Sequence, residues 1–112
     1  MFIEAMNGGK RTAHGVTNNI SGNVATVSGL GFRPSYVMCF YRHYTVGDMM
    51  TEYDGESLKS SFISGQTVNW LELDTSSNSI VFNSDGFVFT RSSDPNPAQS
   101  FQDGRMYYVA IE

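Results

Sequence analysis

The chain has 112 residues, of which 13% are aromatic and 16% charged, and its formal net charge at pH 7 is −4. This composition is typical of a globular domain and argues against a disordered chain. Nucleic-acid binding is disfavoured because only Lys10 and Arg11 stand together, whereas phosphate recognition needs clustered cations. No apolar run approaches the roughly 20 residues of a membrane-spanning helix, so we expect no membrane insertion.

Short β-prone segments separated by turn residues run through the first half of the chain. The clearest corner is Gly29-Leu30-Gly31-Phe32-Arg33-Pro34, in which the glycines allow a sharp bend and the proline precedes the next strand. Residues 36–44 are apolar or aromatic at both alternating sets of positions up to Arg42, which predicts a central strand buried between two layers. The strands expected in this half are 2–5, a weak edge strand at 10–16, 23–30 and 36–44.

The second half gives one strong hairpin signal, Asn83-Ser84-Asp85-Gly86, between the runs 80–82 and 87–90. Residues 45–55 are predicted to form a loop that could include one helical turn, because Gly-Asp and Asp-Gly pairs interrupt them. Residues 92–104 contain two prolines and are expected to be irregular. The other strands expected here are 58–63, 68–73 and 105–112, the last with Val109 and Ile111 facing one side and Tyr108 and Ala110 the other.

The pattern as a whole predicts an all-β fold. No apolar spacing of three and four residues is sustained, so no long helix is expected. Seven or eight short strands with frequent turns favour an antiparallel β-sandwich or jelly-roll-like fold, with a small barrel as the alternative. We expect a single domain over residues 1–112, in which residues 1–22 form a first strand or an N-terminal arm.

The titratable residues form no recognisable catalytic or metal-binding pattern. His14 and His43 lack ligand spacing with Cys39 or with a carboxylate. Cys39 lies in the most apolar strand, where a buried, inert thiol is expected. We read two acidic pairs as solvated side chains and not as a glycosidase pair: Glu52 with Asp54, and Glu72 with Asp74. The sequence therefore predicts a non-enzymatic protein without a metal or cofactor.

Aromatic residues near expected loops and strand ends are the candidate ligand-binding residues. Flat rings can stack on the C–H faces of sugars or anchor a protein partner. The candidates are Tyr44, Tyr53 and Trp70. For each of them a position in the core of the sandwich remains the alternative.

Three segments resemble a recurring β domain of bacteriophage tail, fibre and baseplate proteins. The first is the corner Val27-Ser28-Gly29-Leu30-Gly31-Phe32-Arg33-Pro34-Ser35-Tyr36-Val37. The second is the hairpin segment Asp85-Gly86-Phe87-Val88-Phe89-Thr90, and the third is the closing strand Tyr107-Tyr108-Val109-Ala110-Ile111. The three occur in the order expected for such domains and are spread over residues 23–112.

The resemblance implies a virion protein assembled in the bacterial cytoplasm, with a receptor-binding or decoration role. It also implies a homo-oligomer, with a trimer favoured, contacts with other virion proteins, and recognition of a host cell-surface glycan. Because the three motifs are structural, they assign no functional residue. A purely structural virion subunit in a baseplate, connector or capsid decoration is the alternative, and a polysaccharide-degrading enzyme is the second alternative.

Overall fold

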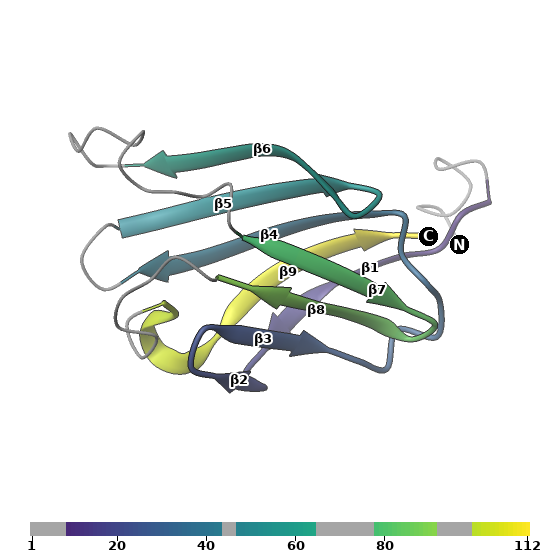
Figure 1. Cartoon of the computed structure of the whole chain (residues 1–112). Coiled ribbons are helices and arrows are strands. Elements are labelled where there is room, and N and C mark those ends of the chain that lie inside the picture. The colour runs from purple at the N-terminus through teal and green to yellow at the C-terminus, as the bar shows by residue number, and fades with distance from the viewer. Residues whose placement is uncertain (1–8, 44–46, 65–77, 92–99) are drawn as a thin grey trace.

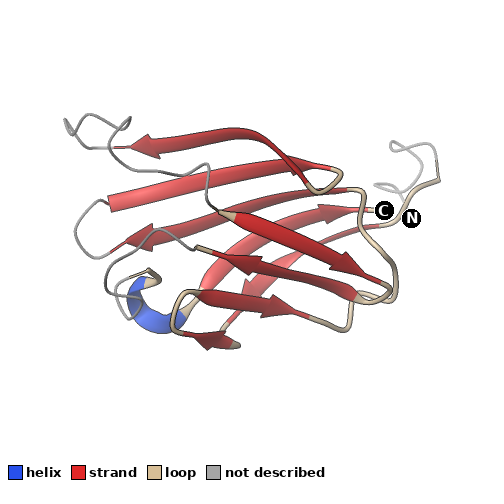
Figure 2. Cartoon of the chain, viewed as in Figure 1, coloured by secondary structure: helices blue, strands red, loops and turns tan. Residues whose placement is uncertain are grey.

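The computed structural model describes residues 9–43, 47–64, 78–91 and 100–112. They form an antiparallel β-sandwich, as the sequence predicts (Figures 1 and 2). One sheet has the strand order β1-β9-β4-β5-β6 and the other the order β2-β3-β8-β7. The strands are β1 (Thr12–Thr17), β2 (Ile20–Ser21), β3 (Val24–Val27), β4 (Tyr36–His43), β5 (Gly47–Asp54), β6 (Ser57–Ser64), β7 (Ser79–Asn83), β8 (Gly86–Thr90) and β9 (Met106–Ile111).

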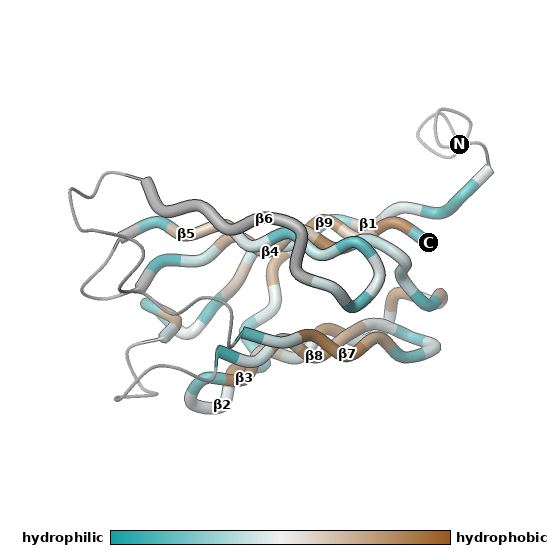
Figure 3. The backbone as a smooth tube through the Cα atoms, turned by 45° about the horizontal axis from the view of Figure 1, so that its top comes forward, coloured by the Kyte–Doolittle hydropathy of each residue, from teal (hydrophilic) through white to brown (hydrophobic). Residues whose placement is uncertain are grey.

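The two sheets lie in separate layers, with β1 crossing to β2 and β3 at one side (Figure 3). The described strands pair only within their own sheet, so the arrangement is the sandwich and not the barrel. The single helical element of the described residues is a short 3-10 turn, η4 (Gln102–Gly104), which precedes β9.

One core lies between the layers, because alternate residues of each strand point inward. β4 contributes Val37, Cys39 and Tyr41, and β8 contributes Phe87 and Phe89, all at most 5% exposed. The aromatic rings meet at an angle, as in the pair Tyr41–Phe89, whose centroids lie 5.6 Å apart. The other buried apolar residues are Ala25, Val27, Phe32, Met49, Tyr53, Ile80, Phe82, Phe101, Met106 and Ala110.

The hairpin of β7 and β8 is confirmed, with Asn83 paired to Gly86 across the turn. Gly86 is required for space: a Cβ atom there would lie 2.0 Å from the carbonyl oxygen of Val27. At the corner, Gly29 and Gly31 have φ values of +81° and +78°, which a residue with a Cβ adopts only with strain.

One edge of the four-stranded sheet is formed by β7, and the other by β2. The amide of Phe82 points away from β8 and donates a hydrogen bond to the Glu56 carboxylate, on the turn between β5 and β6. An unpaired edge amide offers a template for pairing with another chain. Glu56 therefore covers one of these groups.

The expected edge strand near residues 10–16 is confirmed as β1, at the edge of the five-stranded sheet. The strands expected at 23–30, 58–63 and 105–112 are confirmed as β3, β6 and β9. The strands expected at 2–5 and 68–73 lie outside the described residues, as does most of the irregular segment 92–104.

Two expectations are wrong. Residues 47–54 form strand β5 and not a loop, because Met49, Thr51 and Tyr53 alternate into the core and the glycine-containing pairs only mark its ends. β4 is central, between β9 and β5, but the second sheet covers only one of its faces. Phe40, on the other face, is 37% exposed.

Candidate functional site

The outward face of the five-stranded sheet carries apolar side chains in register. Val16 pairs with Tyr107, Tyr107 with Phe40, and Phe40 with Met50, so the four residues lie on one line across β1, β9, β4 and β5. Val16, Tyr107 and Phe40 are 51%, 48% and 37% exposed. We call these four residues the apolar row.

Charged side chains lie beside the apolar row, two residues away from it toward one end of the sheet. They are Arg105, next to Tyr107; Arg42, next to Phe40; and Asp48, next to Met50. Alternation along β4 and β5 puts Arg42 and Asp48 on the same outward face as the apolar row. Arg105 directly precedes β9 and has extended backbone geometry, so the same alternation applies to it. We call Arg105, Arg42 and Asp48 the charged row.

Between described residues, two ion pairs involve the charged row. Arg42 Nε lies 2.7 Å from Asp48 Oδ1, and Arg42 Nη2 lies 3.4 Å from Asp48 Oδ2, so the pair is bidentate. Arg105 Nη2 lies 3.6 Å from Asp103 Oδ2. Each guanidinium therefore has a carboxylate beside it, while all four side chains are at least half exposed.

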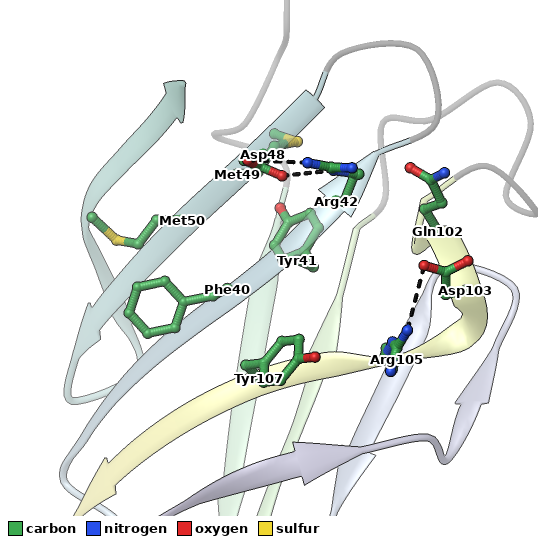
Figure 4. A pocket seen from close by; sticks show the side chains of 10 residues that line it. All are labelled: Phe40, Tyr41, Arg42, Asp48, Met49, Met50, Gln102, Asp103, Arg105 and Tyr107. Carbon is green, nitrogen blue, oxygen red and sulfur yellow. Dashed lines mark hydrogen bonds and ion pairs between the residues drawn. The ribbon is translucent and has the colours of Figure 1, made fainter. Parts of the chain in front are cut away.

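The two rows meet in a pocket of about 600 Å³ (Figure 4). This volume lies within the range of small-molecule sites, roughly 300–1,000 Å³. The lining of the pocket combines aromatic rings and thioethers with amide, guanidinium and carboxylate groups. It is lined by Phe40, Tyr41, Arg42, Asp48, Met49, Met50, Gln102, Asp103, Arg105 and Tyr107.

The turn η4 brings Gln102 and Asp103 to the pocket. Asp103 has a φ of 65°, the one positive value at a non-glycine residue among those the structure describes. Aspartate tolerates this left-handed conformation better than most residues, at some cost in energy. The backbone then returns to extended geometry at Arg105 and enters β9.

The pairing of Arg42 with Asp48 keeps both side chains charged at neutral pH. The hydrogen bond from Arg42 lowers the pKa of Asp48, so Asp48 is a carboxylate at neutral pH, the opposite of what a general acid requires. The bond to Asp48 likewise raises the pKa of Arg42. Burial raises the pKa of Tyr41, so its hydroxyl, which lies 3.4 Å from the hydroxyl of Thr51 in the core, stays neutral.

In the part of the chain that the structure describes, no group of three or more His, Cys, Asp or Glu side chains is placed to hold a metal ion. The same residues contain no helix with the length and apolarity to span a bilayer. Cys39 is fully buried, as expected, and burial raises the pKa of its thiol.

Of the three predicted ligand-binding residues, Tyr53 lies in the core. It is 1% exposed on β5, and its ring packs edge-on against Phe89 with centroids 6.0 Å apart. The expectation of an accessible Tyr53 is therefore wrong, and the core alternative is found. Tyr44 and Trp70 lie outside the described residues.

Of the two acidic pairs, only Glu52 and Asp54 are described. Both lie on the outward face of β5, where the hydroxyl of Tyr36 donates a hydrogen bond to Glu52. Burial, then this bond and the two negative charges, raise the pKa of Tyr36 to about 12. Neither carboxylate lines the pocket.

The pocket residues were not predicted from the sequence, because both faces of β4 were expected to lie in the core. A signal was present in the sequence: Phe40 and Arg42 are two residues apart, as are Arg105 and Tyr107, so in a strand each pair faces the same side. An exposed charge two residues from an aromatic indicates that the aromatic faces the same, open side.

Comparison of the chain with protein-family models, curated proteins and solved structures found no match.

Proposed function

We propose that the chain is a non-catalytic bacteriophage virion domain of tail or fibre type that binds a bacterial surface glycan. One observation carries the binding proposal: the pocket places exposed aromatic rings beside paired arginine and aspartate side chains. The virion setting rests on the resemblance of the corner, the hairpin and the closing strand to phage tail domains. The same resemblance supports the homotrimer, which stays a prediction.

The chemistry of the pocket suits a sugar. Tyr107 and Phe40 offer ring faces on which the C–H groups of a pyranose can pack. The bidentate pair of Arg42 and Asp48 offers donors and acceptors in a fixed plane, which suits neighbouring hydroxyl groups. Because the ion pair already exists, little side-chain entropy is lost on binding.

The test is an array of surface polysaccharides from diverse bacteria, probed with the purified protein and two variants of Tyr107. We expect wild type and Tyr107→Phe, which keeps the ring, to bind the same glycan. Tyr107→Ala should weaken that binding at least about tenfold, the effect of losing one stacked ring. Circular dichroism of each variant checks that the fold is retained.

If the protein binds no polysaccharide on the array, the proposal of a receptor-binding role is wrong. If the protein binds no polysaccharide but is found inside assembled particles by electron microscopy, the structural-subunit alternative holds instead. If it shortens the polymer on incubation, the enzyme alternative holds, and the proposal of a non-catalytic domain is wrong.

A further inference from the structure

We infer that the ligand is a neutral, linear glycan that lies across the strands, along the apolar row from the pocket to Val16. This inference rests on the proposed function and adds to it the shape, charge and direction of the ligand. Val16 does not line the pocket, so it would form a separate contact at the edge strand β1.

The length of the row indicates a chain of sugars. Neighbouring strands lie about 4.8 Å apart, so the row from β1 to β5 spans about 14 Å over three strand spacings. That distance exceeds the width of one pyranose ring. A monosaccharide would occupy the pocket, which Tyr107 lines, and leave Val16 uncovered.

The chemistry of the two rows indicates how the chain lies. Sugars have apolar C–H faces and polar hydroxyl edges, and here an apolar row runs parallel to a charged row on the same face. A chain placed along the apolar row turns its hydroxyl groups toward Arg42, Asp48 and Arg105. The register of the sheet therefore sets the direction of the ligand, perpendicular to the strands.

The balance of charge indicates a neutral ligand. Arg42 is paired with Asp48, and Arg105 lies beside Asp103, so the two cations and two anions that the described residues contribute to the pocket cancel. An acidic sugar would have to compete with Asp48 and Asp103 for the two guanidinium groups. A neutral sugar can accept from the arginines and donate to the aspartates without breaking either pair.

The apolar area of the row is small for an interface with a second copy of the chain. An aromatic side chain has about 200 Å² of surface, so the exposed parts of Tyr107, Phe40 and Val16 together offer roughly 300 Å². A stable protein interface needs about 800 Å² from each partner. A narrow ligand fits the row better than a protein surface does.

The experiment uses malto-, cello- and chito-oligosaccharides of increasing length, with oligogalacturonate as the acidic comparison, titrated calorimetrically into the full chain. We expect one neutral series to bind, with an affinity that rises with length and then levels off. Val16→Asp should weaken the longest oligomer at least tenfold and leave the shortest binding fragment unchanged. Val16→Ser, a milder change, should have the same effect to a smaller degree.

Val81→Asp is the matched control, because Val81 is also an exposed strand valine, 60% exposed, but lies on β7 of the other sheet. We expect it to leave all affinities unchanged. The extended site would be overturned if the affinity did not depend on oligosaccharide length and Val16→Asp had no effect on it. If Tyr107→Ala still weakened binding in that case, the proposed function would stand. Preference for oligogalacturonate, or no binding to any neutral series, would also overturn the inference, and the polysaccharide array decides separately whether the proposed function fails with it.

Discussion

The carboxylate of Asp85 accepts a hydrogen bond from the backbone amide of Gly31 at 2.9 Å, although 54 residues separate the two in sequence. Its other oxygen accepts from Gly29 at 2.8 Å, and the amide of Leu30 donates to the Asp85 carbonyl oxygen. The corner after β3 and the hairpin between β7 and β8 therefore form one structural unit. Asp85, in the turn between β7 and β8, thus fixes the conformation of the corner at Gly29 and Gly31.

Replacing Asp85 should destabilise the fold. Asp85→Asn keeps one acceptor and loses the charge, and Asp85→Ala loses both acceptors, so we expect the melting temperature to fall by a few degrees, more for alanine. Differential scanning calorimetry at pH 7 measures the effect. Ser84→Ala, a change in the same turn, is the control, and an equal fall for that variant would contradict the role of Asp85.

The contribution of Asp85 should depend on pH. The hydrogen bonds from Gly31 and Gly29 lower its pKa in the folded state, below the ordinary value of 3.8. The carboxylate therefore stabilises the fold fully above about pH 5 and loses its effect as the pH falls through the folded-state pKa. The difference in melting temperature between wild type and Asp85→Asn should be constant from about pH 5 to 8 and shrink below about pH 4. A difference that grows in acid would contradict this assignment.

Gly86 should tolerate no side chain. A Cβ atom 2.0 Å from the carbonyl oxygen of Val27 forces β8 away from β3, so we expect Gly86→Ala to cost more than about 3 kcal/mol in free energy of unfolding. Gly31→Ala is the comparison, because that position has open space and strains only the backbone, at about 1–2 kcal/mol. Urea denaturation gives both values. A larger loss of unfolding free energy for Gly31→Ala than for Gly86→Ala would show that the corner tolerates a side chain less well than the contact between β8 and β3.

Removal of the Glu56 carboxylate should expose the amide of Phe82 at the edge of β7. We expect Glu56→Ala to lower stability by about 1 kcal/mol and to increase self-association, since the edge amide becomes available to another strand. Glu56→Gln retains an acceptor and should behave nearly as wild type. Sedimentation velocity over a range of concentrations tests this, and identical behaviour of the two variants would argue against a protective role for the carboxylate.

The fold class could be predicted from the sequence because its signals are local. The turn residues Asn83 to Gly86 and the glycines of the corner determine where the chain bends, and alternation in residues 106–111 determines which side of β9 is buried. Strand β5 was missed because Gly47-Asp48 and Asp54-Gly55 are turn signals that here only bound the strand. Its place in the sheet depends on pairing with β4, which is a non-local contact.

The candidate site could not be predicted because it depends on which face of a strand is covered. Phe40 and Met38 are as apolar as Val37 and Cys39, so composition alone does not distinguish the outward face of β4 from the inward one. The pairing register, which aligns Phe40 with Tyr107 and Met50, becomes visible only in the folded sheet. The 3-10 turn that brings Asp103 beside Arg105 has no sequence signal beyond an Asp-Gly pair.

The alternation of β4 has a consequence for how this domain can diverge. Val37, Cys39 and Tyr41 maintain the interior, while Phe40 and Arg42 between and beyond them face outward. Single substitutions at the outward positions can alter what the surface recognises without requiring a compensating change inside. Recognition and stability can thus be selected separately, although their determinants are interleaved one residue apart on the same strand.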